Sequence, residues 1–166
     1  ATLDLTDRPG PAYLRLYREN SPVIFGENYR FEFGKAVTLR EGTDLTIIGT
    51  GVQSVRALEA CDLLAAEGVS AHLLHVHTLK PIDGDAIAAA ARKSGRVLTT
   101  EEHNIFGGLG GAVAEVLCQR APVPMRIHGL QDCYLESGPN DALLQKYGLT
   151  PRHVADAAKA LLRASR

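Results

Sequence analysis

An acidic pair and a histidine, Glu101-Glu102-His103, follow an apolar run that begins at Val97. A carboxylate beside an imidazole can perform acid–base chemistry. Four glycines lie within Gly107–Gly111, ahead of a segment that favours a helix. A strand, a glycine loop and a helix in this order place a crevice at the carboxyl end of the strand, where α/β proteins bind ligands. No nucleophile accompanies the acids, so we favour a structural role, with one acid solvated and the other accepting hydrogen bonds from loop amides.

The glycines of Gly107–Gly111 have two interpretations of their own. Their backbone amides can cradle an anion. The Gly-Lys-Ser/Thr sequence of a P-loop is missing, however, so no lysine is placed to reach a phosphate. The favoured interpretation is close packing of this backbone against a neighbouring domain, which glycine permits because it has no Cβ.

A second glycine pair, Gly49 and Gly51, follows an apolar run and opens a predicted helix. It almost matches the dinucleotide fingerprint G-x-G-x-x-G, with Ser54 in the place of the third glycine. The fingerprint also needs an acid at the end of the next strand to hold the ribose. That strand ends in His75 and His77 instead. The sequence therefore favours a tight strand-to-helix turn, with nucleotide binding as the alternative.

The same strand end holds a candidate zinc site. Side chains alternate along a strand, so His75 and His77 share a face, whereas His72 lies on the other. With the distant His103, these two could ligate zinc. Aspartate and cysteine partners at ligand spacing are missing, so we expect partly buried, hydrogen-bonded histidines and no metal ligand in this chain.

Two arginines near the start of the chain, Arg15 and Arg18, are three residues apart. The planar guanidinium fork suits phosphate. Arginines on protein surfaces are common, so a solvated side chain is the competing interpretation.

The composition excludes several classes of protein. The chain has 166 residues, 45% of them hydrophobic, and a net charge of −1. This length suffices for one domain with a real core, and no basic field is present to attract nucleic acid or a membrane surface. The apolar runs are shorter than the about 18 residues that span a bilayer. Three cysteines without a CxxC pair indicate reduced thiols and a cytoplasmic protein.

Hydrophobic periodicity and turn signals predict alternating strands and helices. We expect strands at 12–17, 36–39, 44–48, 71–76, 97–100 and 125–128, and helices at 52–67, 83–94, 112–120 and from 151 onward. The connector between 36–39 and 44–48 is too short for a parallel crossover, so these strands should be antiparallel. The expected fold is α/β: three αβα layers around a mixed, mostly parallel sheet of about five strands, with one antiparallel edge strand.

Residue types at the predicted helix ends agree with these boundaries. Asp83 suits an N-cap, and Thr150 suits an N-cap ahead of Pro151 at the first helical position. Gly68 is expected to end a helix in the left-handed conformation, and Gly95 to end the next one.

The N-terminal region does not follow the alternating pattern of strands and helices in the rest of the chain. No partner for the predicted strand 12–17 is evident nearby. We therefore expect residues 1–25 to be the tail of a preceding domain, residues 26–34 to be a linker, and residues 35–166 to form the compact domain.

Four motifs resemble the C-terminal domain of the transketolase family, particularly the C-terminal part of the split form. They are Asp44-Leu-Thr-Ile-Ile-Gly-Thr-Gly51, His77-Thr-Leu-Lys-Pro-Ile-Asp83, Thr100-Glu-Glu-His-Asn-Ile-Phe-Gly-Gly-Leu-Gly-Gly111 and Glu136-Ser-Gly138. The resemblance covers roughly residues 10 to 163 and gives residues 1–25 an origin in the middle, pyrimidine-binding domain. The second and third motifs are fairly specific to the family.

The resemblance implies a transferase that moves two-carbon ketol units between phosphosugars. Its first two domains bind thiamine diphosphate and a divalent metal such as Mg²⁺, usually across a homodimer. The third domain, which this chain resembles, borders that site and makes assembly contacts. Arg18 occupies the position of an arginine that binds substrate phosphate.

The family's Gly-Asp-Gly diphosphate motif and its cofactor-activating glutamate are missing from this chain. We therefore expect no catalytic residue and no bound cofactor here, and an isolated chain that is inactive. Its expected partners are the N-terminal and middle domains, or a subunit that carries them.

Two alternatives stay open. The first motif is shared with 1-deoxyxylulose-5-phosphate synthase and with the β subunits of 2-oxoacid dehydrogenases, so the chain could belong to one of these. A free-standing nucleotide- or anion-binding regulatory module is the second alternative, and it predicts dinucleotide binding through Gly49 and Gly51.

Overall fold

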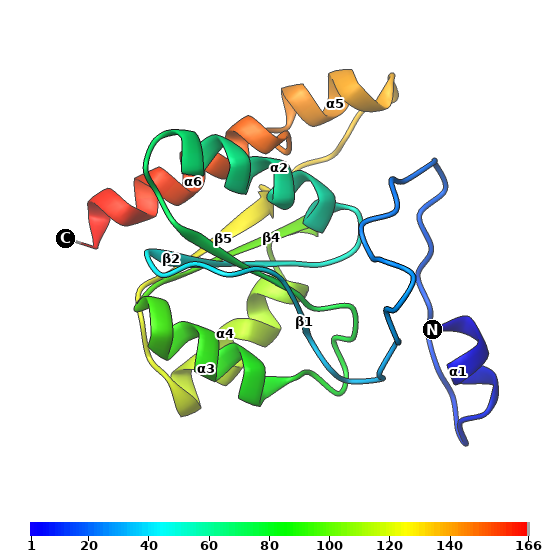
Figure 1. Cartoon of the computed structure of the whole chain (residues 1–166). Helices are drawn as coiled ribbons and strands as arrows, with labels where there is room; N and C mark the ends of the chain where they lie inside the picture. Colours follow the sequence, from blue (N-terminus) through cyan, green and yellow to red (C-terminus); the bar gives the residue numbers. More distant parts are fainter. Residues whose placement is uncertain (166) are drawn as a thin grey trace.

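A computed structural model describes residues 1–165, which form a β-sheet between two layers of helices, preceded by an extended N-terminal region (Figure 1). The strands are β1 (Val37–Arg40), β2 (Leu45–Gly49), β3 (Ala71–His75), β4 (Val97–Asn104) and β5 (Met125–Leu130). The helices are α1 (Thr2–Thr6), α2 (Gln53–Ala66), α3 (Gly84–Ser94), α4 (Leu109–Arg120), α5 (Asn140–Lys146) and α6 (Pro151–Ala164).

The five strands of the described region lie in the order β1-β3-β2-β4-β5. The pairs β3/β2, β2/β4 and β4/β5 are parallel, and β1 is antiparallel to β3. β2 and β3 are buried along their whole length, as expected for central parallel strands covered on both faces. The predicted fold class, including its antiparallel edge strand, is confirmed.

The predicted antiparallel orientation of β1 and β2 is confirmed, but the two strands are not neighbours in the sheet. β1 pairs with β3, not with β2, because the connector between β1 and β2 crosses over the start of β3. Asp44 Oδ2 accepts a hydrogen bond of 2.7 Å from the Ser70 backbone N–H. A Cβ at Gly42 would lie 2.2 Å from the Ala71 carbonyl carbon, so this crossing requires glycine.

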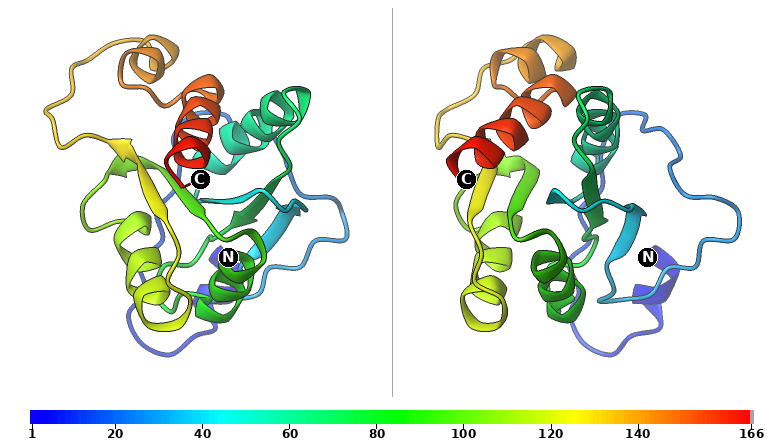
Figure 2. Two further views of the ribbon diagram at one scale, coloured as in Figure 1. Left: turned by 90° about the vertical axis from the view of Figure 1, so that its left-hand side faces the viewer. Right: turned by 60° about the vertical axis from the view of Figure 1, so that its left-hand side comes forward.

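The helices cover both faces of the sheet, α2 and α6 on one and α3 and α4 on the other (Figures 1 and 2). Each layer has its own core. The first includes Leu45, Ile47, Cys61, Leu64, Leu73, Val154 and Leu161. The second includes Ile48, Leu74, Ile87, Val97, Leu109, Val113 and Leu117. Helix α6 thus contributes Val154, Ala158 and Leu161 to the first core.

Most helix boundaries follow the predicted caps. Asp83 Oδ1 accepts a hydrogen bond of 3.1 Å from the Ala86 N–H at the start of α3. Gly68 and Gly95 have φ values of +78° and +70°, the left-handed conformation of a helix C-terminus. Thr150 lies at the N-cap of α6 without a side-chain capping bond, because its hydroxyl contacts His153 Nδ1 at 2.7 Å.

Two predicted boundaries were wrong by several residues, and two helices were missed. β4 continues to Asn104, four residues past its predicted end, and its register with β5 is irregular after Thr100. α4 begins at Leu109, three residues before the predicted start, and includes two glycines. Helices α1 and α5 were not predicted, since their five and seven residues are too few for a periodic signal.

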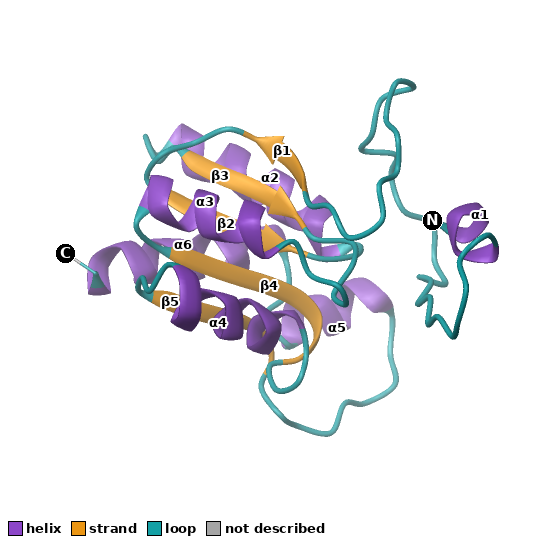
Figure 3. Cartoon of the chain, turned by 90° about the horizontal axis from the view of Figure 1, so that it is seen from below, coloured by secondary structure: helices purple, strands orange, loops and turns teal. Residues whose placement is uncertain are grey.

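The N-terminal region extends away from the sheet (Figures 1 and 3). Residues 12–17 form no β-pairing in the described structure, so their assignment as a strand is not confirmed within this chain. We call residues 7–24 the arm. Tyr17 at its centre accepts a hydrogen bond of 3.2 Å from Asn140 Nδ2. The boundaries proposed at residues 25 and 34 stay a prediction.

No helix within residues 1–165 combines the length and the apolar character needed to cross a membrane.

Candidate functional site

The carboxyl ends of the parallel strands bring together the polar residues noted in the sequence. β3 ends at His75, with His77 two residues further, and β4 ends with Glu101, Glu102 and His103. Parallel strands end at one edge of a sheet, and ligands of α/β proteins bind there. We call this region the strand-end site.

Glu101 is fully buried and fills the start of α4. Its carboxylate accepts hydrogen bonds of 2.8 Å from the backbone N–H groups of both Leu109 and Gly110. These groups lie at the positive end of the helix dipole, where an anion is most stable. A Cβ at Gly108 would lie 2.0 Å from Glu101 Oε2, so this loop is shaped around the carboxylate.

The assignment of one acid as a cap for loop amides is therefore confirmed. The amides of the glycine loop that could cradle an external anion already bind Glu101. His103 Nδ1 lies 3.8 Å from Glu101 Oε2, so this acid and imidazole are neighbours. Because the carboxylate is committed to the helix, the pair is structural.

One of the two acids was expected to be solvated, but the second acid, Glu102, is paired. Its Oε2 accepts a hydrogen bond of 2.5 Å from the guanidinium of Arg56, which is 9% exposed. Arg56 also donates to Gln53 Oε1 at 2.7 Å, and Gln53 Nε2 donates to the Leu149 carbonyl at 3.0 Å. A buried arginine needs such partners, so this network joins α2 to β4 and to the loop before α6.

Sequence reasoning missed Arg56 and Gln53. The two residues are three apart and share the inward face of α2, where a polar pair interrupts the apolar pattern. That interruption was the available signal. Its partner Glu102 is 46 residues away, and no local pattern links them.

The two histidines at the end of β3 are held by hydrogen bonds and aromatic rings. His75 Nδ1 contacts the Ser54 hydroxyl at 2.7 Å, and His77 Nδ1 contacts Thr78 Oγ1 at 2.7 Å. Phe25 packs against His75, and Phe31 packs against His77, with ring centroids 5.6 and 4.5 Å apart. The aromatic residues after the arm therefore cover this strand end.

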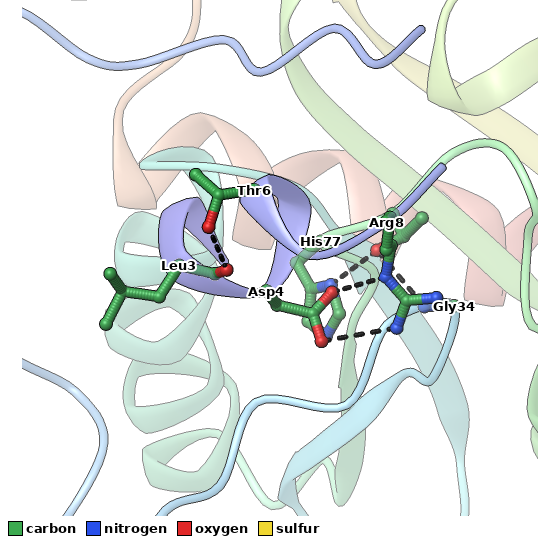
Figure 4. A network of polar contacts seen from close by, with 7 residues as sticks. Leu3, Asp4, Thr6, Arg8, Gly34 and His77 are labelled. Carbon is green, nitrogen blue, oxygen red and sulfur yellow. Dashed lines mark hydrogen bonds and ion pairs between the residues drawn. The ribbon is translucent and has the colours of Figure 1, made fainter. Parts of the chain in front are cut away.

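Burial lowers the pKa of His75 to about 4, and the neighbouring His77 contributes to the decrease. Burial also lowers the pKa of His77. Both imidazoles are therefore neutral near pH 7. Figure 4 shows His77 beside Gly34, whose N–H donates to the hydroxyl that His77 contacts.

These contacts confirm the interpretation of partly buried, hydrogen-bonded histidines. No group of three or more histidine, cysteine or acidic side chains in residues 1–165 is arranged to hold a metal ion. The zinc hypothesis for His75, His77 and His103 therefore has no geometric support in the described chain.

The turn between β2 and α2 is tight, as predicted. A Cβ at Gly49 would lie 2.7 Å from Ser54 Oγ, and Gly51 has a φ of +53°. The hydroxyl of Ser54 is directed to His75 and not toward an open crevice. The site thus shows close strand–helix packing without the acid that a ribose requires.

Neither arginine of the arm forms an ion pair with Glu101 or Glu102 in the described structure. Arg18 is exposed and forms no ion pair within residues 1–165. Arg15 lies near His103, whose pKa is lowered first by burial and then by the Arg15 cation. Arg18 as a phosphate ligand therefore stays a prediction.

Residues 34–154 match the family described as Transketolase, C-terminal domain. A similar protein is the 6-deoxy-6-sulfo-D-fructose transketolase subunit SqwH of Clostridium sp. strain MSTE9, 46% identical over 149 residues, which are 90% of this chain and 46% of that protein. The 1-deoxy-D-xylulose-5-phosphate synthase of Heliobacterium modesticaldum is 39% identical over 134 residues, 80% of this chain and 21% of the synthase.

A solved structure titled "Split gene transketolase, inactive beta4 tetramer" aligns with a TM-score of 0.94 at 43% identity. The alignment covers 99% of this chain and 54% of that one. The chain thus spans about half the length of the split-subunit proteins it matches.

Proposed function

The chain belongs to the family of transketolase C-terminal domains, and from this premise we propose that it is the assembly domain of a thiamine-diphosphate-dependent transketolase. The complete enzyme would transfer two-carbon ketol units between phosphosugars. Sequence relatives that are transketolase subunits support this proposal.

The observation that carries the proposal is the unpaired arm. Residues 12–17 are extended and exposed, and their apolar side chains lie on both faces of the segment, with Tyr13 88% and Leu16 73% exposed. A segment whose backbone groups are unpaired and whose apolar side chains are exposed can satisfy both by joining a sheet. We infer that this sheet belongs to a preceding, pyrimidine-binding domain.

The strand-end site of this chain does not suit the cofactor. The helix N-terminus that could receive a diphosphate is filled by Glu101. A trio of metal-ligating side chains is not found in the part of the chain that the structure describes. We therefore assign the binding of thiamine diphosphate and Mg²⁺ to the half of the protein that the relatives have and this chain does not cover. We assign no step of the reaction to this domain alone.

Arg18 is the residue of this chain that we assign to substrate. It follows the extended segment and is exposed, with its guanidinium free of ion pairs inside residues 1–165. When the arm joins a neighbouring domain, this side chain moves with it toward that domain. A guanidinium fork there can hold a substrate phosphate by two hydrogen bonds.

A homodimer of the complete enzyme follows from the same proposal. A synthase of 1-deoxyxylulose 5-phosphate is the alternative, because such proteins match most of this chain. The dinucleotide module is less well supported, since Ser54 and His75 contact each other where a ribose-binding acid would be needed.

Activity of the full-length protein with phosphosugar donors and acceptors tests the function. Arg18→Ala should raise the KM for phosphorylated sugars at least tenfold and change the KM for an unphosphorylated ketose donor much less, because only the phosphate contact is lost. Arg163→Ala, an exposed arginine on α6, is the matched control. An equal effect of Arg18→Ala on both kinds of sugar would remove it from the phosphate site.

Calorimetric titration of the isolated chain provides the second test. Thiamine diphosphate with Mg²⁺ and, separately, NAD should each give no binding heat. Saturable binding of the thiamine cofactor would contradict its assignment to the other half, and NAD binding would support the regulatory module.

A further inference from the structure

Two neighbouring loops at the ends of β4 and β5 display large apolar side chains. Phe106 is 69% exposed, Leu135 is 51% exposed, and Tyr134 is fully exposed. We call these three residues the edge patch. Figure 3 shows both loops leaving the carboxyl ends of β4 and β5. The arm lies toward the same end of the parallel strands.

Hydrogen bonds hold the two loops beside each other. Asn104 Nδ2 donates to Asp132 Oδ1 at 2.7 Å, and Asn104 Oδ1 accepts from the Phe106 N–H at 2.9 Å. The Ile105 N–H also donates to the Leu130 carbonyl at 3.0 Å. The backbone of Phe106 is thus itself fixed, and Tyr134 lies two residues beyond the fixed Asp132.

The second loop is anchored at its far end as well. The Glu136 N–H donates to the Tyr147 hydroxyl at 3.3 Å, and Lys146 Nζ donates to Glu136 Oε1 at 2.6 Å. The side chains of the edge patch are therefore presented by fastened loops. Clustered exposed apolar side chains on a folded domain are characteristic of an interaction surface, and aromatic residues contribute most to such contacts.

The arm reaches the same side of the molecule. Tyr17 is hydrogen-bonded to Asn140, four residues after Glu136. Any polypeptide that precedes Ala1 is connected through the arm, so it is held close to the edge patch at a high effective concentration.

We propose that the edge patch docks against the upstream half of the same protein, the part that relatives have and this chain does not cover. The proposal rests on the proposed function, because it takes this chain to be a C-terminal domain. The matched family describes a C-terminal domain, and the chain spans 46% of one split subunit. The occupant is thus a folded domain with an apolar recess for Phe106 and Tyr134.

Thiol labelling can test this docking, because Cys133 lies beside Tyr134 and is exposed. The rate of its modification by a soluble maleimide is followed by mass spectrometry in the full-length protein and in residues 1–166 alone. We expect Cys133 to react at least tenfold more slowly in the full-length protein. Cys118, which is exposed on α4, is the internal control and should change less than twofold.

Variants separate docking from a general change in the loop. Phe106→Ser and Tyr134→Ser in the full-length protein should restore the labelling of Cys133 at least fivefold. Leu63→Ser removes a comparable exposed side chain on α2 and should not. Equal labelling of Cys133 in the two proteins, or variants without effect, would overturn the proposal.

Protection of Cys133 in the isolated chain that increases with protein concentration would identify a second copy as the occupant, which also overturns the proposal. The outcome does not depend on catalysis. Protected Cys133 in a full-length protein without transketolase activity would leave the docking intact and reject the function. An active enzyme in which Cys133 is not protected would support the function and reject the docking.

Discussion

The buried carboxylate of Glu101 offers the sharpest test of the structure. Glu101→Gln keeps the shape of the side chain and removes its charge. The amide oxygen can still accept one hydrogen bond, but the amide nitrogen then faces a buried backbone N–H, either that of Leu109 or that of Gly110. One buried donor therefore loses its acceptor.

The expected loss follows from the two contacts. A hydrogen bond to a charged group contributes about 1.5–3 kcal/mol, and a neutral one about 1 kcal/mol. Losing one charged bond and weakening the other lowers the free energy of unfolding by about 2–4 kcal/mol. With a urea m value of about 2 kcal/mol per M, in the middle of the usual range, the midpoint falls by about 1–2 M.

Urea unfolding followed by circular dichroism measures this change, with Glu115→Gln as the control. Glu115 is an exposed glutamate on the same helix, α4, and its substitution should change the free energy of unfolding by no more than about 0.5 kcal/mol. If both variants shift the midpoint equally, the carboxylate does not hold the start of α4, and the account of the glycine loop is refuted.

Two further predictions concern groups whose pKa is shifted by burial. Burial raises the pKa of the Cys61 thiol to about 11, so Ellman's reagent at pH 8 should titrate Cys118 and Cys133 in the native chain and reach Cys61 only after unfolding; three thiols reacting at similar rates would contradict this. The pKa of His75 falls from 6.5 to about 4 on folding, so the unfolded chain binds more protons between these values. Stability should therefore decrease as the pH falls from 6.5 toward 4, by up to about 3 kcal/mol from this residue. His75→Asn should show a smaller decrease over the same window in urea titrations at each pH, and a slope identical to that of the original chain would show that His75 does not contribute.

Most of the fold was predictable because its signals are local. Central strands buried on both faces consist of continuous apolar residues, as in Leu45–Gly49, and helices buried on one face follow the 3.6-residue period. Asp83 and Gly95 act within one turn of their own helix, so residue type suffices to locate its ends.

The strand-end site was predictable only in part. The prediction that one acid caps the loop amides succeeded because the glycines that need an acceptor follow the acids closely in sequence. The prediction that the other acid is solvated was wrong because the partner of Glu102, Arg56, lies on another element. The predicted strand 12–17 is not confirmed, because no strand within residues 1–165 pairs with it.

By itself, the sequence determined most strands and helices of the compact domain, where most of these helices are capped, and which faces are buried, since these depend on residues within a few positions of one another. Only the tertiary structure decided that β1 pairs with β3 and that Arg56 neutralises Glu102. Such contacts join elements far apart along the chain. Their geometry depends on how the packed layers bring these elements together, because burial leaves each charge and backbone donor only the partners that the fold places beside it.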